Sequence, residues 1–319
     1  MPDTGLDRRP PVNPGKFEDP DFTAKRKLRA FVSLTRLRTL WFNTGSLCNI
    51  ACNNCYIESS PRNDRLAYLS LAEVRAYLDE IEQLGWRVEK IGFTGGEPFL
   101  NRECPGMLGE ALARGYQVLV LTNAMRPMQR RKEQLLDLRL RHGASLTMRV
   151  SIDHFLPEKH EAVRGRGTWR PMMEGLRWLA ANGFRRHVAG RMLWHESEKE
   201  IRAGFACLFA AEGIPIEADD PGSLVLFPEM DITTEVPEIT THCWDILGKR
   251  PEQMMCASSR MVIKRKGAAS PVVVPCTLLP YDPQFEMGET LAAAKTTVKL
   301  NHPFCAQFCV LGGASCSAN

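Results

Sequence analysis

The run TLWFNTGSLCNIACNNCY, residues 39–56, contains the two features from which the architecture of this chain can be worked out. Its first part, TLWFNT, is an apolar run with the length of a buried strand. Its second part carries Cys48, Cys52 and Cys55, whose thiolates can ligate three irons of a cubane cluster and leave the fourth iron without a protein ligand. An open metal position of this kind is typical of a reaction site, because a group other than protein can bind there.

The spacing of these cysteines argues against zinc. A structural zinc site needs four ligands, typically arranged as two pairs. The nearest other cysteine is Cys104 and the nearest histidine is His142, so no fourth ligand lies close in the sequence. A zinc site completed from elsewhere in the chain is the alternative to a cluster.

Outward from this run, strand-like and helix-like segments alternate up to about residue 230. The expected strands cover residues 39–44, 88–94, 117–123, 146–152, 187–193 and 223–227. The expected helices cover residues 70–84, where SLAE is a capping box, and then 105–114, 128–142, 171–182 and 197–212. Six β-then-α units predict an α/β fold, a partial (β/α)6 barrel, with active-site groups at the carboxyl ends of the strands.

The pattern divides the chain into three parts. Residues 1–37 are rich in proline and basic residues and are expected to form an extension before the core of residues 38–230. Residues 231–319 are dense in cysteine and contain two β-prone pieces, RMVIKRKG and SPVVVPC, which predict a hairpin that turns across residues 266–270. This last part is expected to be a small domain in which metal ligation replaces a large apolar core.

Composition excludes several classes of protein. The net charge of +4 is too weak to indicate nucleic-acid binding, although it is compatible with a small acidic protein partner. No apolar run reaches the roughly 18 residues that a membrane span needs. The polar, proline-rich start has no apolar signal segment, which predicts a cytoplasmic protein. Eleven cysteines in such a protein indicate metal binding rather than disulfides.

A second motif, TGGEP, covers residues 94–98 at the end of the second expected strand. Its glycines let the backbone approach a ligand closely, and Glu97 could pair with an ammonium group. Alone, the motif would be an ordinary Gly–Gly turn. Weaker signals for ligand binding lie at the ends of later strands, where LTNA contains Asn123 and VSIDH contains Ser151 and Asp153. The alternative is that these polar residues form a solvated barrel rim without a binding role.

Charged residues near the last strands are open to two interpretations. Arg191 lies inside an apolar run, so a barrel-facing side chain would need an anionic partner, whereas an outward one would pair with a helix. Asp220 and Glu229 lie close to the sixth strand, where either could accept a proton from a substrate. The alternative for both is a solvated loop carboxylate.

Taken together, the cysteine motif and GGEP resemble the radical S-adenosylmethionine (radical SAM) superfamily. That superfamily has C-x3-C-x2-C on the loop after the first strand of a βα barrel, with GGEP at the end of the second. The resemblance implies a [4Fe–4S] cluster on Cys48, Cys52 and Cys55, whose open iron binds the amino and carboxylate groups of SAM. It further implies cleavage of SAM to methionine and a 5′-deoxyadenosyl radical, which abstracts a hydrogen atom from a substrate.

The same resemblance implies a set of SAM contacts. Gly95, Gly96 and Glu97 would hold the amino group, and Arg191 would face the carboxylate. The other residues implied to line the cofactor site are Tyr56, Pro98, Asn123, Ser151 and Asp153. The sequence departs from the family pattern at Asn54, because the residue before the third cysteine is often aromatic or His, whereas here the aromatic Tyr56 follows it.

The C-terminal cysteines resemble a truncated SPASM, or twitch, domain with one auxiliary [4Fe–4S] cluster. The resemblance implies Cys256, Cys276, Cys305 and Cys309 as ligands, although the last pair is spaced by three residues rather than the commoner two. Cys316 is left over; it could replace one of the four or act as a thiol that returns a hydrogen atom to a substrate radical. A single zinc ion holding this segment is the alternative.

The function implied is a radical SAM enzyme that oxidises, rearranges or epimerises a small molecule or short peptide, with flavodoxin or ferredoxin as electron donor. The short extension favours this over the first alternative, a maturase that modifies a ribosomally made peptide or a partner protein. The second alternative, from another class, is a non-enzymatic iron–sulfur protein that transfers electrons. Only the enzyme interpretations require GGEP beside the cysteines.

Overall fold

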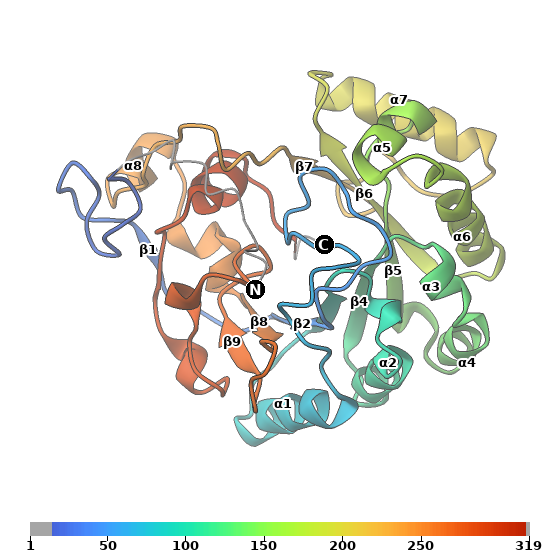
Figure 1. Ribbon diagram of the computed structural model, residues 1–319, viewed down its shortest axis with the longest axis horizontal. Coiled ribbons are helices and arrows are strands. Elements are labelled where there is room, and N and C mark those ends of the chain that lie inside the picture. Colours follow the sequence, from blue (N-terminus) through green and yellow to red (C-terminus); the bar gives the residue numbers. More distant parts are fainter. Residues whose placement is uncertain (1–14, 317–319) are drawn as a thin grey trace, which may run out of the picture.

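An eight-stranded sheet organises the chain, of which the computed structural model describes residues 15–316 (Figure 1). The strand order is β7-β6-β5-β4-β3-β2-β8-β9, and every neighbouring pair is parallel except the last. The strands are β2 (Thr39–Asn43), β3 (Lys90–Thr94), β4 (Gln117–Thr122), β5 (Leu146–Ser151), β6 (Arg185–Met192), β7 (Leu224–Pro228), β8 (Ser259–Ile263) and β9 (Val272–Val274). Because β2 to β7 follow each other in sequence and space, their carboxyl ends all meet at one edge.

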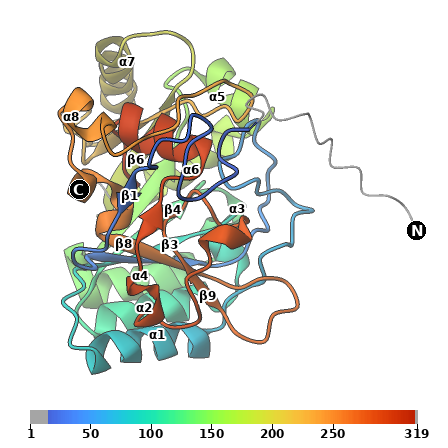
Figure 2. The same ribbon diagram turned by 90° about the vertical axis from the view of Figure 1, so that its left-hand side faces the viewer.

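Helices cover the outer face of this sheet, and Figure 2 shows α1 beside α2 beneath it. They are α1 (Leu71–Gln83), α2 (Cys104–Ala113), α3 (Arg126–Gln129), α4 (Lys132–His142), α5 (Pro157–Arg164), α6 (Trp169–Ala181) and α7 (Glu198–Ala211). The capping box expected at the first helix is present, because the Ser70 hydroxyl accepts from the Glu73 N–H and the Glu73 carboxylate accepts from the Ser70 N–H.

Two apolar clusters hold the layers together. One lies between the sheet and the helices and includes Phe42, Phe93 and Val150. The other lies on the opposite face, where Trp41 and Met261 pack against the C-terminal part of the chain. Alternation along each strand therefore sends one set of side chains into the helical layer and the other into the barrel.

The C-terminal part completes the barrel edge instead of standing apart from it. β8 lies parallel to β2 and β9 returns as a hairpin, which confirms the turn expected across residues 266–270. Further elements are α8 (Cys243–Leu247), a π-helix at Cys305–Leu311 and a small antiparallel pair of β1 (Phe31–Val32) with β10 (Val298–Lys299). The domain boundaries expected at residues 37/38 and 230/231 stay predictions.

The predicted α/β fold is confirmed, with a few corrections in detail. The segment expected as one helix over 128–142 is divided into α3 and α4, which are separated by Arg130 and Arg131. The short helix α5 and the parallel addition of β8 to β2 were not expected. Part of the expected N-terminal extension, residues 1–14, lies outside the described residues. None of the helices that the structure describes has the length and apolar character that a membrane span requires.

Candidate functional site

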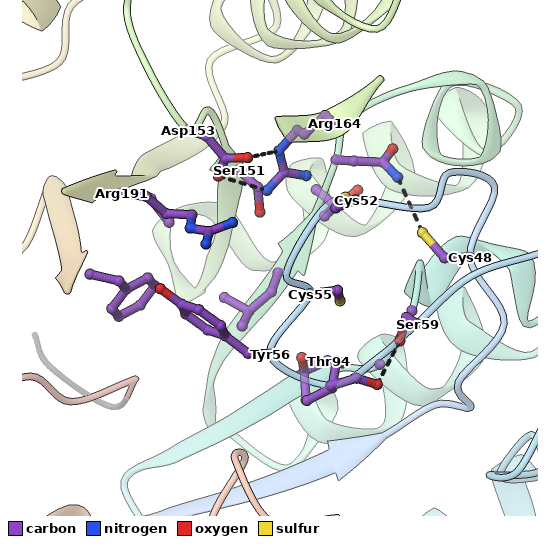
Figure 3. A pocket seen from close by; sticks show the side chains of 18 of the residues that line it. Cys48, Cys52, Cys55, Tyr56, Ser59, Thr94, Ser151, Asp153, Arg164 and Arg191 are labelled. Carbon is purple, nitrogen blue, oxygen red and sulfur yellow. Dashed lines mark hydrogen bonds and ion pairs between the residues drawn. The ribbon is translucent and has the colours of Figure 1, made fainter. Parts of the chain in front are cut away.

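The three cysteines of the first motif line one cavity at the carboxyl ends of the strands (Figure 3). The cavity encloses about 1000 Å³, counting its solvent-open mouth. Cys48, Cys52 and Cys55 lie on the loop that leaves β2, and the Cys48 N–H donates to the Ser60 carbonyl at 3.1 Å to close that loop. Burial raises the pKa of Cys48 to about 12 and also raises that of Cys52. Such thiols become ligands when a bound metal displaces their protons.

The arrangement of the sulfurs fits a cluster better than a single ion. The three thiols line one cavity, and the sequence supplies no fourth cysteine or histidine close to them. In a cubane cluster each cysteine ligates a different iron, so the three sulfurs lie further apart than three ligands of one zinc. The donor set therefore fits an iron–sulfur cluster.

The glycine turn after β3 packs directly on the cysteine loop. The Gly96 N–H donates to the Gly45 carbonyl at 2.9 Å, and both Gly95 and Gly96 line the cavity. A Cβ atom on Gly96 would lie 2.1 Å from the Leu47 carbonyl oxygen, and Gly95 has a φ of +138°. Glycine is therefore needed at both positions, because any side chain would push the loop away.

Glu97 is held by groups of the neighbouring strand end. Its carboxylate is buried and accepts hydrogen bonds from the Thr122 hydroxyl and the Asn123 N–H, both at 2.8 Å. Neither Glu97 nor Pro98 lines the cavity. Burial raises the pKa of Glu97 to about 7. Glu97 thus ties the β3 turn to the end of β4, and its expected contact with an ammonium group stays a prediction.

The residues expected at the later strand ends do converge on the cavity. Asn123, Ser151, Asp153 and Arg191 all line it. The Asn123 side-chain amide donates to the Asn49 carbonyl oxygen at 2.9 Å and lies 4.0 Å from the Cys48 sulfur. The carboxyl ends of β4, β5 and β6 therefore supply polar groups to the same space that the cysteines occupy.

Arg191 faces the barrel interior and not the surrounding helices. In this structure its anionic partner is a residue of the protein itself, Glu229. Its Nε donates to the Glu229 carboxylate at 3.2 Å, and its Nη2 forms an ion pair with the same group. The guanidinium lies 5.1 Å from the centre of the Tyr56 ring. Glu229, expected as a proton acceptor, is therefore engaged in positioning Arg191.

The structure accounts for Asn54, the departure within the cysteine motif. Its φ is +53°, a left-handed conformation that Asn tolerates better than most residues. Its side-chain amide donates to the Met230 carbonyl at 2.7 Å and to the Glu229 carboxylate. Tyr56, which lines the cavity, donates from its hydroxyl to the Pro228 carbonyl at 2.6 Å. The loop is thereby fastened to the end of β7.

The two remaining catalytic candidates lie in different places. Asp220 lies before the first residue of β7, at the end of the strand remote from the cavity, and its carboxylate accepts from the Ser223 hydroxyl at 2.6 Å in an exposed turn. It is withdrawn as a catalytic candidate. Cys316, in contrast, is buried and lines the cavity, and burial raises the pKa of its thiol.

A second, smaller cavity lies beside the first. It encloses about 380 Å³ and is lined by apolar side chains together with Cys256, Cys276, Cys305 and Cys309. The π-helix places the last two cysteines on one side, because residues four apart in a helix are neighbours. Cys316 is not part of this lining, whereas Leu278 lines both cavities.

A buried cation lies next to this second group of cysteines. Arg260 on β8 is fully buried, and its guanidinium donates to the carbonyls of Ala294 at 2.8 Å, Cys256 at 2.6 Å, Ser259 at 2.8 Å and Thr296 at 3.2 Å. Burial lowers the pKa of Arg260 to about 10, and the nearby Cys256 and Cys276 oppose that shift. A buried guanidinium needs a nearby negative charge, which these thiolates would supply.

Two residues that line the cavity are absent from the expected set of SAM contacts. Arg164, at the end of α5, lines the first cavity and forms an ion pair with Asp153. Thr277, next to Cys276, lines the same cavity from the C-terminal side. The stretch from Asp153 through His160 to the Arg164–Gly165 pair resembles one found in many peptide- and cofactor-modifying radical SAM enzymes, but this resemblance assigned no role to Arg164. Helix α5 itself is too short and polar to be expected from periodicity.

Comparisons with known proteins agree with this geometry. A family model described as the radical SAM superfamily matches residues 42–204. The GTP 3′,8-cyclase of Tolumonas auensis is 28% identical over 153 residues, covering 47% of this chain and 43% of that protein. The antilisterial bacteriocin subtilosin biosynthesis protein AlbA of Bacillus subtilis is 28% identical over 162 residues, covering 49% and 34%. The matches thus span less than half the length of these curated relatives.

A solved structure shares the fold. Streptococcus suis SuiB bound to S-adenosylmethionine superposes with a TM-score of 0.59 over 80% of this chain and 63% of that chain. Its sequence identity is 11%, so the likeness concerns the fold alone.

Proposed function

Since this chain belongs to the radical SAM superfamily, we propose that it cleaves S-adenosylmethionine reductively and abstracts a hydrogen atom from a substrate. The observation that carries the proposal is that Cys48, Cys52, Cys55 and the Gly95–Gly96 turn line one cavity at the carboxyl ends of parallel strands. Cys48, Cys52 and Cys55 would hold a [4Fe–4S] cluster, which, once reduced, would supply the electron for cleavage of SAM to methionine and a 5′-deoxyadenosyl radical. The other residues of the cavity bind and orient the reactants.

The polar rim offers contacts to the amino, carboxylate and hydroxyl groups of SAM. The backbone of the Gly95–Gly96 turn approaches the cavity without side chains, which suits the amino group. Ser151 and Asn123 offer a hydroxyl and an amide to the methionyl group or the ribose. Arg191, held by Glu229 over the Tyr56 ring, presents a fixed cation to the SAM carboxylate. These groups are already held in place by the protein, so little side-chain entropy is lost when SAM binds.

We further propose an auxiliary [4Fe–4S] cluster on Cys256, Cys276, Cys305 and Cys309. The support is that all four line one apolar cavity and that Arg260 is buried against two of them. Cys316 is then free of this ligand set. Its place in the first cavity supports the alternative in which its thiol returns a hydrogen atom to the substrate radical.

The substrate would bind between the two groups of cysteines. The wall on that side is formed by Tyr56, Phe227, Thr277 and Leu278, which are aromatic, apolar or uncharged. This lining suits an uncharged part of a small molecule or short peptide. One of the relatives is a bacteriocin biosynthesis protein, and this similarity supports peptide maturation as the alternative function. In either case a low-potential protein such as flavodoxin or ferredoxin would deliver the electron.

Product analysis tests the proposal. Reconstituted protein is reduced with dithionite, mixed with SAM and analysed for 5′-deoxyadenosine, with the C48A/C52A/C55A triple variant as the control. We expect the product from the wild type and none from the triple variant. A wild type that holds full iron but forms no 5′-deoxyadenosine would favour the electron-transfer alternative.

Iron counting tests the auxiliary cluster separately. The triple variant should keep about four irons, the content of one cubane cluster. A C305A/C309A variant should keep the first cluster and lose the second. Complete loss of iron in the triple variant would remove the auxiliary cluster from the proposal.

A further inference from the structure

The last turn of α5 packs against the middle of the cysteine loop. The Asn53 N–H donates to the Val163 carbonyl at 2.7 Å, and the Asn53 side-chain amide donates to the Ala162 carbonyl at 2.9 Å. Because Cys52 precedes Asn53 and Arg164 follows Val163, these two bonds bring Cys52 and Arg164 to the same place. Figure 3 shows the Arg164 side chain beside Cys52 in the cavity that both residues line.

Asp153 fixes the guanidinium of Arg164 in this position. The Arg164 Nε and Nη2 donate to the two oxygens of Asp153 at 2.8 and 3.1 Å, which is a bidentate contact. The pair is secluded, since 15% of the Arg164 side chain and 3% of the Asp153 side chain are exposed. A second bond holds Asp153, because its carbonyl accepts from the Arg191 N–H at 3.1 Å. The cation therefore cannot swing away from the cysteine loop without breaking this set of contacts.

The two charges of the pair do not act equally on the cysteines. Arg164 lines the same cavity as Cys52 and Cys55, and Figure 3 shows its guanidinium between Asp153 on one side and Cys52 on the other. The positive end of the pair therefore points toward the sulfur. Solvent screening is weak at a buried position, so this imbalance persists at physiological salt.

We propose that Arg164 sets the reduction potential of the cluster carried by Cys48, Cys52 and Cys55, with Asp153 as its positioning partner. This rests on the proposed function only in requiring that the cluster is bound. Reduction adds one electron from an external low-potential donor to the cluster, and no bond forms or breaks in the protein. The added negative charge is stabilised by a guanidinium held nearby in a medium of low dielectric constant, which raises the potential.

Potentiometric EPR titration without SAM tests the proposal on the full chain. The signal that disappears in the C48A/C52A/C55A variant identifies the first cluster. In R164Q we expect its reduced-to-oxidised ratio at a fixed potential to fall about tenfold, which is about 59 mV for one electron. In D153N we expect a shift in the opposite direction, because the guanidinium keeps its charge and loses the carboxylate that offsets it. R164K should lie between the wild type and R164Q.

A matched control separates a local effect from net charge. Arg166 lies two residues further on and is exposed, so R166Q makes the same change of charge at the surface and should leave the potential unchanged. Shifts of R164Q and D153N in the same direction, or an unchanged potential in R164Q with full iron, would overturn the proposal. If R164Q fails to hold the cluster, the potentials of D153N and R164K still test the proposal. Formation of 5′-deoxyadenosine is scored independently, so either proposal can fail alone.

Discussion

Asn54 shows how one residue can be selected by backbone shape rather than by contact with a cofactor. Its left-handed φ of +53° turns the chain between Cys52 and Cys55, and its amide joins that turn to Glu229 and the Met230 carbonyl. An aromatic residue would suffer strain at this φ and could not make these bonds. The motif therefore departs from the family pattern at a position where the chain conformation requires Asn or Gly.

Two substitutions at this position separate strain from hydrogen bonding. N54G keeps the left-handed conformation and loses the amide bonds, so it should cost about 1 kcal/mol in the free energy of unfolding. N54A loses the same bonds and adds roughly 1 kcal/mol of backbone strain. Denaturant unfolding of the two variants measures the difference. Equal stability of N54G and N54A would contradict a role for the left-handed conformation.

His160 predicts how the protein responds to acid. It is fully buried on α5 with its ring edge-on to Trp169, and neither ring nitrogen has a hydrogen-bond partner among residues 15–316. Burial lowers its pKa from 6.5 to about 4. As the pH falls from 6.5 to 4, the unfolded chain takes up a proton that the folded chain does not accept. The free energy of unfolding should therefore fall over this window, by up to ~3 kcal/mol.

The variant H160F isolates this contribution. It keeps an aromatic ring against Trp169 and removes the titrating group, so the loss of stability between pH 6.5 and 4 should become smaller. H242Q, at an exposed histidine, is the matched control and should leave the pH dependence as in the wild type. Denaturant unfolding at several pH values within this window gives the answer. An unchanged slope in H160F would remove His160 as a source of the acid sensitivity.

At the scale of elements, the contact between the β3 turn and the cysteine loop is the most sensitive junction. G96A would place its Cβ 2.1 Å from the Leu47 carbonyl oxygen, a backbone atom that cannot rotate away. We expect this variant to displace the loop and to lose the iron bound by Cys48, Cys52 and Cys55, while far-UV circular dichroism stays near that of the wild type. Iron analysis of the purified protein provides the measurement.

G106A is the matched control for this prediction. Gly106 lies in α2 and is exposed, and a Cβ atom at this position would meet only the flexible Leu71 side chain, at 3.4 Å. Alanine is a better helix former than glycine, so G106A should keep its iron and gain up to about 1 kcal/mol in stability. A G96A protein with full iron and an unchanged melting temperature would show that the loop tolerates the extra atom.

The elements of the core could be predicted because their patterns are local. The strand 117–122 contains the continuous apolar run 118–121, and the capping box at Ser70 marks a helix start within four residues. Helix α5 was missed because PEKHEAVR buries only His160 and Val163, too few apolar positions for a periodic signal. The consequence was that the ion pair between Arg164 and Asp153 was not expected. Similarly, the use of the Glu97 carboxylate by Thr122 depends on a contact between strands that no local pattern encodes.

At the scale of the whole molecule, the N-terminal segment is tied to the C-terminal part by a buried ion pair. Arg29 and Glu238 have side chains that are 0% and 6% exposed, and their atoms Nη2 and Oε1 lie 2.6 Å apart. Glu238 also accepts from the N–H groups of Phe17 and Ala24. This ion pair joins residues that are far apart in sequence. The composition of residues 1–37 predicted only an extension, so the contact could not be expected.

Breaking this pair should be costly. E238Q leaves the Arg29 charge buried without its counter-charge, which should lower the free energy of unfolding by about 3–5 kcal/mol. D137N, which removes the partner of Arg141 in an exposed pair, should change it by less than about 1 kcal/mol. Denaturant unfolding compares the two. Similar small effects in both variants would mean that the N-terminal segment contributes little to stability.

The short segment from Cys276 to Leu278 has a consequence for how the protein matures. Cys276 lines the second cavity, Thr277 the first, and Leu278 both, so three consecutive residues separate the two cavities. The auxiliary cluster proposed above, bound at Cys276, would restrain the same segment that lines the first cavity. Iron content at the second site should therefore influence substrate binding at the first, although the two cavities share only this short stretch of chain.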